Sequence, residues 1–157
     1  MNLNDKYKTL FNSYHVNTPL RIAHFMAQIE HESGGFKFLT ELGGKKYFEK
    51  HEGRKDLGNT VIGDGFKFRG RGYIQVTGRA NYTVLSKDVR IDFLNNPDSL
   101  SEEANAMISA LWYWGKHKLN ELADLDNIET ITKRINGGFN GLTERKKLLI
   151  KWKSIIS

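Results

Sequence analysis

The feature that most constrains the fold of this chain is an amphipathic helix predicted between Thr18 and Gly35. Thr18 suits the N-cap and Pro19 the first helical position, whereas Gly34 or Gly35 can take the left-handed conformation that ends a helix. Four apolar residues recur at helical spacing and predict a buried stripe: Ile22, Phe25, Met26 and Ile29. This helix must therefore pack against other elements of the chain.

Glu32 lies at the C-terminal end of the predicted helix, at the edge of its buried stripe, three residues after Ile29. A carboxyl group at the border of an apolar surface can keep a transferable proton, which is what a general acid requires. The alternative is a solvated glutamate in a last helical turn. Glu32 is therefore a candidate catalytic acid that needs a second carboxyl group to support it.

Length and composition indicate one compact domain over residues 1–157. Hydrophobic residues make up 39% of the chain and charged residues 27%, as in ordinary globular proteins. The absence of cysteine excludes disulfides and thiolate metal sites. We see no stretch long enough to span a membrane and no signal peptide, and we therefore expect synthesis in the cytoplasm without an export signal.

The net charge of +6 favours a polyanionic partner. Nucleic acid, an acidic cell-wall polymer and a membrane surface all satisfy this requirement, and charge alone does not choose among them. Four lysines near the C-terminus are candidates for adsorption to such a partner: Lys146, Lys147, Lys151 and Lys153. Their alternative role is a solvated helix face.

The remaining pattern predicts an α+β fold that is mainly α-helical. Apolar periodicity predicts helices over about 7–14, 101–116, 128–135 and 143–156. The inward residues of the second and fourth are expected to be Ala104, Met107, Leu111 and Trp114, and Leu148, Leu149, Trp152 and Ile155. Nine of the fifteen glycines lie between Gly43 and Gly78, and residues 73–77 predict a short strand in this loop-rich stretch. We expect a small irregular β element beside the Glu32 helix.

Two loop glutamates, Glu41 and Glu52, can complement Glu32 chemically. Hydrolysis of a glycosidic bond needs one carboxyl group to protonate the leaving oxygen and another to activate water or attack the sugar. A helix-end glutamate and a more solvated loop glutamate would give the two groups different proton affinities. Residue spacing alone leaves the choice between Glu41 and Glu52 open.

The segment over residues 63–82 interleaves basic, aromatic and glycine residues, a pattern that suits a groove for a polymer. Gln75 and Thr77 would share one side of the predicted strand, with Asn81 shortly after the turn at Gly78. Basic residues interleaved with aromatic rings also suit single-stranded nucleic acid. The plainer alternative is a structural hairpin with solvated arginines.

Several motifs in order resemble the family 19 glycoside hydrolases, the plant-type chitinases and the related bacteriophage endolysins. The motifs are Ala27-Gln28, His31-Glu32-Ser33-Gly34-Gly35, Glu52-Gly53-Arg54, Gly63-Asp64-Gly65, Arg69-Gly70-Arg71-Gly72, Ile74-Gln75-Val76-Thr77-Gly78-Arg79, Asn81-Tyr82, Asn136-Gly137-Gly138, and Asn140-Gly141-Leu142 with Arg145. The resemblance covers about Pro19 to the C-terminus. It implies a lysozyme-like fold and inverting hydrolysis of a β-1,4 bond next to an N-acetylated amino sugar.

The resemblance also implies roles for particular residues. Glu32 matches the general acid, and Thr77 matches the hydroxyl that holds the attacking water. Glu52 is the first choice for the base, because Gly53-Arg54 matches the family segment and Arg54 would keep a nearby carboxylate ionised. Glu41 matches the position that some phage relatives use, and Thr77 should lie near whichever glutamate is the base. Five residues are expected to bind substrate: Tyr73, Gln75, Asn81, Asn136 and Arg145.

We therefore expect a monomeric endolysin, a single catalytic domain without a separate cell-wall-binding domain, that cleaves the glycan strands of peptidoglycan for host cell lysis. It would need no cofactor, bind no nucleic acid and not insert stably into a membrane, and would reach the wall through a separate membrane pore. A chitinase is the nearest alternative. A catalytically silent wall-binding module and a nucleic-acid-binding protein are alternatives of other classes. A metal site formed by His24, His31 and His51 is a weaker hypothesis.

Overall fold

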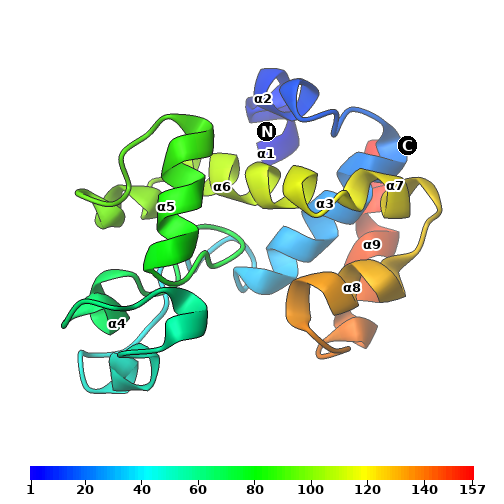
Figure 1. The fold of residues 1–157 in the computed structure, drawn as a ribbon. Coiled ribbons are helices and arrows are strands. Elements are labelled where there is room, and N and C mark those ends of the chain that lie inside the picture. The colour runs from blue at the N-terminus through cyan, green and yellow to red at the C-terminus, as the bar shows by residue number, and fades with distance from the viewer. The chain divides into compact units, whose positions relative to one another are not determined.

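The computed structural model describes residues 1–157, and the chain is mostly helical (Figure 1). It divides into two compact units. The first unit comprises Met1–Phe36 and Leu111–Ser157, and the second comprises Lys37–Ala110. Helix α6, over Glu103–Lys116, contributes residues to both units.

The first unit consists almost entirely of helices. They are α1 (Leu3–Lys6), α2 (Lys8–Ser13), α3 (Pro19–Glu32), the C-terminal part of α6, α7 (Leu119–Asp124), α8 (Ile128–Asn136) and α9 (Leu142–Ile156). Helix α3 packs along α9 and also contacts α7. The long helix that carries Glu32 is thus held by elements from the other end of the sequence.

Helix α3 confirms the helix predicted from the sequence. The Thr18 hydroxyl accepts a hydrogen bond from the Arg21 amide at 3.2 Å, and Pro19 takes the first helical position. In the predicted stripe Phe25, Met26 and Ile29 are fully buried, and Ile22 is partly buried. The Phe25 ring meets the rings of Phe11 and Trp114 edge-on, with centroids 5.2 and 5.3 Å away. Such edge-to-face contacts fix the rotation of the helix and hence the direction of its polar end.

The four other predicted helices correspond to α2, α6, α8 and α9. Two inward positions were wrong. Ala104 is exposed in the first turn of α6, and Ile155 is 47% exposed near the C-terminal end of α9. Periodicity defines the face of a helix but not how far along its length that face is covered.

The second unit contains α4 (Asp64–Lys67), α5 (Arg79–Val89) and the start of α6, joined by loops and by 3₁₀ turns at Tyr47–His51, Lys55–Leu57 and Pro97–Ser101. Helix α5 was not predicted: Gly78 precedes it and no side chain caps its N-terminus. The only β structure in the chain is two isolated bridges, Thr40↔Arg71 and Arg71↔Val76.

The strand predicted over residues 73–77 is therefore wrong. Arg71 and Val76 exchange two backbone hydrogen bonds at 3.1 and 2.9 Å, and the residues between them form a tight turn. Gly72 and Gln75 both have positive φ, at 86° and 60°. The composition of residues 73–77 favours a strand, but no neighbouring strand is present to pair with them. They form a turn instead, next to the buried side chain of Arg71.

Arg71 is 1% exposed and serves as a polar centre of the second unit. Its guanidinium donates hydrogen bonds to Asp98 at 2.8 Å, to the Tyr82 hydroxyl at 2.9 Å and to the Lys67 carbonyl at 2.8 Å. Burial raises the pKa of Tyr82 to about 12, so its hydroxyl keeps its proton and donates to the Arg69 carbonyl. Loops with little regular structure are thereby tied together by side chains.

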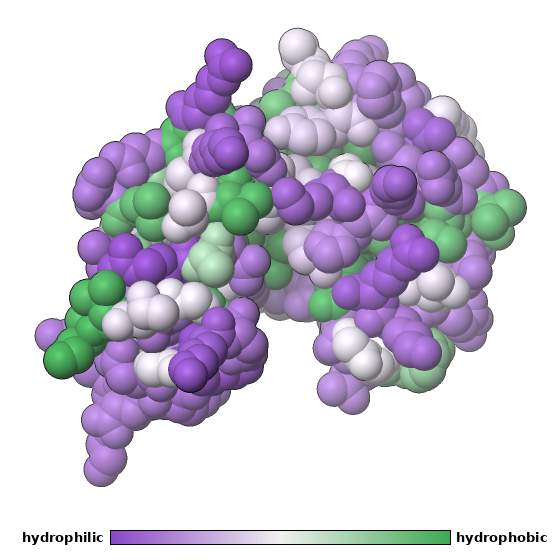
Figure 2. Space-filling model, viewed as in Figure 1, coloured by the Kyte–Doolittle hydropathy of each residue, from purple (hydrophilic) through white to green (hydrophobic).

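Hydrophilic side chains cover most of the surface seen in Figure 2, and apolar ones occur in separate patches. The largest exposure of an apolar side chain within an ordered loop is that of Ile62, at 99%, just before α4. None of the helices combines the length and the apolar character that crossing a membrane would require.

Candidate active site

Glu32 ends helix α3 and is held by an ion pair. Its Oε1 accepts a hydrogen bond from Arg145 Nη2 at 2.7 Å, and its side chain is 21% exposed. Arg145 reaches it from the first turns of α9, the helix along which α3 packs. Burial, and then the negative charge of Glu32, raise the pKa of the neighbouring Tyr113. The carboxyl group is thus fixed on one side and open to solvent on the other.

Arg145 donates its side-chain hydrogen bonds to groups within the first unit. Besides Glu32, it donates to Gln28 Oε1 at 2.6 Å and to the Asn140 carbonyl at 3.1 Å. Gln28 in turn donates to Thr132 on α8 at 3.2 Å. The guanidinium is 1% exposed, which does not fit the expectation that Arg145 binds substrate directly. Gln28 belongs to the Ala27-Gln28 motif, but the sequence alone predicted no role for it.

His31, the neighbour of Glu32, packs against the loop that begins α9. A Cβ on Gly141 would clash with the His31 ring, and Gly141 has a φ of 74°, so only glycine fits this close approach. Burial, and then the charge of Arg145, lower the pKa of His31. A neutral His31 therefore helps to join the end of α3 to the start of α9.

Asn136 lies exposed at the C-terminal end of α8. Its Oδ1 accepts a hydrogen bond from the Asn140 amide at 3.4 Å, which leaves its side-chain NH₂ without a partner in the protein. This position is compatible with the substrate contact expected for it.

In the second unit, Glu41 is bound to Gly70 twice. The Glu41 amide donates to the Gly70 carbonyl at 2.7 Å, and the Gly70 amide donates to Glu41 Oε1 at 3.1 Å. His51 Nε2 lies 3.5 Å from the same oxygen, and neither ring nitrogen of His51 has a hydrogen-bond partner. The Glu41 side chain remains 25% exposed. Its carboxylate is oriented by the backbone and is accessible to solvent.

Three oxygen atoms converge on Gly70. A Cβ placed there would lie 2.8 Å from Gln75 Oε1, 3.1 Å from Thr77 Oγ1 and 3.3 Å from Glu41 Oε1. Glu41 is therefore the loop glutamate that has Thr77 as its neighbour. Nothing in the residue spacing identified Gly70 as the centre of this arrangement.

Gln75, Thr77 and Asn81 are oriented by hydrogen bonds to backbone carbonyls. Gln75 Nε2 donates to Gly72 at 2.8 Å, Thr77 Oγ1 to Gln75 at 3.0 Å, and Asn81 Nδ2 to Thr77 at 2.8 Å. The sequence argument placed Gln75 and Thr77 on one side of a strand. They do point to one place, but through the positive φ of Gln75 and not through strand periodicity.

Glu52, the first choice for the base, has different neighbours. Its two carboxylate oxygens accept hydrogen bonds from the amides of Gly63 and Gly65, at 3.1 and 3.4 Å, at the start of α4. Arg54 does not neutralise Glu52 as expected, because its guanidinium pairs with Asp56. The structure thus places Glu52 as a cap on backbone amides.

Tyr73 is 2% exposed and lies in the interior of the second unit, a position that does not fit an open substrate contact. The three histidines of the metal hypothesis have other surroundings: His24, for example, is buried and bonded to Asp126 at 2.6 Å. The structure contains no group of three or more residues suited to hold a metal ion.

The four lysines of α9 are all paired with carboxylates. Lys146 pairs with Glu129, Lys147 with Glu144, Lys151 with Glu30 and Lys153 with Asp126, at 3.1, 3.4, 2.6 and 2.6 Å. Each of these ammonium groups therefore has a carboxylate beside it within the protein. Exposed lysines without such a pair occur instead in the second unit at Lys37, Lys46 and Lys55.

Comparisons with known proteins give matches in sequence over most of the chain. The family model for class I chitinases matches residues 12–136. A glycosyl hydrolase family 19 domain-containing protein of Haemophilus influenzae is 37% identical over 155 residues, covering 80% of this chain and 75% of that protein. An endochitinase of Arabidopsis thaliana is 30% identical over 118 residues, but the match covers 74% of this chain and only 39% of the plant protein.

Solved structures show the same fold. A bacterial family 19 chitinase superimposes with a TM-score of 0.72 at 20% identity, covering 88% of this chain and 74% of that one. Chitinase C from Streptomyces griseus gives a TM-score of 0.71 at 19% identity and covers 88% and 60% of the two chains. The expected lysozyme-like, mainly helical fold is confirmed.

Proposed function

Because the chain belongs to glycoside hydrolase family 19 and is a glycoside hydrolase, we propose that it cleaves the β-1,4 bonds of bacterial peptidoglycan by inverting acid/base catalysis. The observation that carries this proposal is the convergence of Glu41, Thr77 and Gln75 around Gly70. A carboxylate, a hydroxyl and an amide at one point are suited to bind and orient a water molecule.

In this mechanism Glu32 protonates the oxygen of the leaving sugar. Its partner Arg145 is a positioning residue, since it is buried and acts through Glu32. A bidentate or forked arginine fixes direction as well as charge, because its donors lie in one rigid plane. The links from Thr132 through Gln28 to Arg145 extend this support to α8.

Glu41 acts as the general base, in place of Glu52. It takes a proton from water as the water attacks the anomeric carbon, and the Thr77 hydroxyl holds that water. The Gly70 amide holds the carboxylate in place through its hydrogen bond to Oε1. Glu52 instead stabilises the loop before α4. Gln75, Asn81 and Asn136 bind the sugar chain.

The positive charge supports peptidoglycan as substrate, because the carboxylates of its peptides make that polymer anionic. Chitin, which is uncharged, is the second candidate, and it is favoured by the names of the plant relatives. The test is digestion of purified peptidoglycan and of chitin by the same preparation, with the new reducing ends identified by mass spectrometry. Cleavage of chitin alone would overturn the choice of substrate. A folded protein that cleaves neither polymer would support a silent binding module.

The role in lysis is a separate part of the proposal. The enzyme would stay in the host cytoplasm until a separate membrane pore opens, and would then reach the wall. Expression in bacteria with and without a pore-forming protein tests this role. Lysis only when the pore is present is the expected result, and lysis without the pore, or in neither case, would contradict it.

A further inference from the structure

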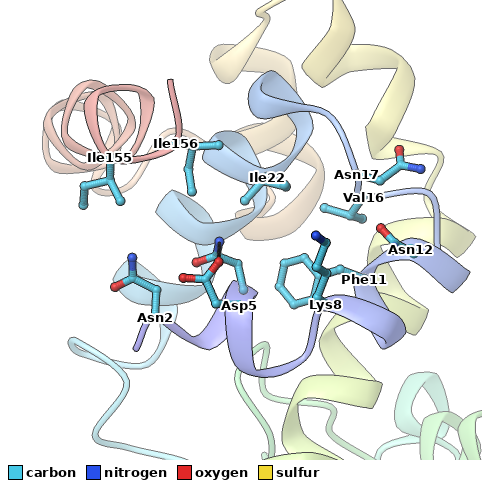
Figure 3. A pocket seen from close by; sticks show the side chains of 11 residues that line it. Asn2, Asp5, Lys8, Phe11, Asn12, Val16, Asn17, Ile22, Ile155 and Ile156 are labelled. Atoms are coloured by element: carbon cyan, nitrogen blue, oxygen red, sulfur yellow. Dashed lines mark hydrogen bonds between the residues drawn. The ribbon is translucent and has the colours of Figure 1, made fainter.

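A cavity of about 300 Å³ lies within the first unit, between the two N-terminal helices and the packed pair α3 and α9 (Figure 3). Ile22 enters it from α3, and Ile155 and Ile156 enter from the end of α9. Asp5 and Lys8 lie on the opposite side. None of the lining residues is one to which a role in catalysis is assigned above.

The polar wall of this cavity carries unused hydrogen-bonding groups. Asn4 is 8% exposed, and its Oδ1 is buried without any hydrogen-bond partner. The side chains of Asn2, Asn12 and Asn17 also line the cavity and make no hydrogen bond within the protein. A carboxamide offers both a donor and an acceptor, the same pair that a peptide group requires. A buried acceptor without a partner in the protein leaves one hydrogen bond that a bound molecule or an ordered water can supply.

The facing wall is mainly aliphatic and the rim carries both charges. Ile22, Val16 and the two isoleucines of α9 suit small alkyl groups. The one aromatic ring in the lining, Phe11, is 2% exposed and offers no open face on which a sugar ring could stack. Asp5 and Lys8 supply a carboxylate and an ammonium, and neither is in an ion pair. The ligand that fits has amide groups, small alkyl side chains, a carboxylate and an ammonium.

We propose that this cavity binds the short peptide carried by the glycan strands of peptidoglycan. The chemistry of that peptide matches the lining: alanine methyl groups for the aliphatic wall, peptide groups for the asparagines, and opposite charges for Lys8 and Asp5. This inference rests on the proposed function, because it assumes that peptidoglycan is the substrate. It adds a second point of attachment, which would raise affinity for strands that carry peptides.

The binding test uses the whole protein and the synthetic tetrapeptide L-Ala–γ-D-Glu–L-Lys–D-Ala. Addition of the peptide should shift the amide NMR signals of α1, α2 and the end of α9. The variant Lys8→Glu should weaken binding by about fivefold or more, whereas Lys87→Glu, the same change at an exposed lysine of α5, should leave the affinity unchanged. Absence of shifts in these segments, or equal shifts with N-acetylglucosamine oligomers, would overturn the peptide site.

The activity test separates this inference from the proposed function. Glycan strands with their peptides and strands stripped by an amidase are digested in parallel. The expected result is cleavage of both, with a KM about fivefold lower for the peptide-bearing strands, and loss of that difference in Asn12→Leu. Equal KM values on the two substrates would overturn the peptide site while leaving the function intact. No cleavage of either substrate would contradict the proposed function itself, and the peptide NMR shifts would then decide the site alone.

Discussion

The regions around Glu32 and Glu41 hold a carboxylate in two different ways. Glu32 ends a fourteen-residue helix and is fixed by one buried arginine that comes from a distant part of the sequence. Glu41 lies in a loop and is fixed by backbone groups of Gly70, with Thr77 and Gln75 close by. The comparison shows that a helix can hold a carboxylate at its end through one ion pair, whereas an irregular loop needs several short polar contacts to do the same.

Among changes that test this comparison, a substitution at Glu32 is expected to have the largest effect on activity. The variant Glu32→Gln keeps the shape of the side chain and its acceptor for Arg145 but lacks the transferable proton. We expect cleavage of peptidoglycan to fall by roughly 10²–10⁴-fold, the usual contribution of general acid catalysis. Initial rates of release of reducing ends measure the loss, with circular dichroism as the control for folding. Retention of more than about a tenth of the wild-type rate would reject Glu32 as the acid.

The next effect concerns the support of Glu32. Arg145→Lys keeps the charge but cannot bridge Glu32, Gln28 and the Asn140 carbonyl at once. We expect kcat to fall by about tenfold with KM nearly unchanged, because the substrate is bound as before but the acid is less well placed. Steady-state kinetics separate the two parameters. A raised KM with a normal kcat would instead mean that Arg145 binds substrate.

A smaller effect is expected at the centre of the Glu41 region. A methyl group in Gly70→Ala would press on Gln75, Thr77 and Glu41, and the expected loss of kcat is about three- to tenfold. Gly44→Ala is the matched control, since a Cβ there meets nothing within 4 Å and its φ is not positive. Equal activity of the two variants would show that the oxygens around Gly70 are not a working arrangement.

The smallest effect is on stability and depends on pH. Asp64 of α4 is buried and accepts two hydrogen bonds from Arg79 of α5, at 2.7 and 2.8 Å, which lower its pKa. A lowered pKa means that this stabilisation is present above the unfolded value near 3.9 and is lost as the pH falls through the folded one. We expect Asp64→Asn to lower the free energy of unfolding by about 2 kcal/mol at pH 7. The difference from the wild type should narrow below about pH 4.

Urea unfolding followed by circular dichroism at pH 7, 5 and 3 measures this difference. Asp56, which is exposed and paired only with its neighbour Arg54, provides the control variant Asp56→Asn. If the difference in free energy of unfolding between Asp64→Asn and the wild type stays constant from pH 7 to pH 3, the ionised pair does not hold α4 to α5.

The Glu32 region was largely predictable from the sequence, and the Glu41 region was not. Capping by Thr18, the buried stripe and the final glycines are local signals, and α3 follows them. Around Glu41 the composition indicated a strand, but the buried Arg71 and two positive φ angles produced a turn. Contacts between Glu41 and Gly70, which are 29 residues apart, leave no periodic signal.

Family motifs filled part of this gap. They brought Thr77, Gln75 and Asn81 into the candidate site, although the strand argument for them was wrong. They also favoured Glu52 because of its neighbours Gly53 and Arg54. In the structure, however, Arg54 pairs with Asp56, and Glu52 accepts hydrogen bonds from backbone amides. Sequence neighbours are a poor guide to spatial neighbours in a glycine-rich loop, where the chain can turn at almost any residue.

The central claim is that Glu41, beside Thr77, activates water, and chemical rescue tests it most directly. Azide is added to Glu41→Ala and to Glu52→Ala, and the product is analysed by NMR. Azide can replace activated water in a variant that lacks the base, but it cannot restore a cap on backbone amides. The account predicts that Glu41→Ala is inactive, regains activity with azide and forms an α-glycosyl azide from the β-linked substrate. Rescue of Glu52→Ala without rescue of Glu41→Ala, or a β-glycosyl azide, would contradict it.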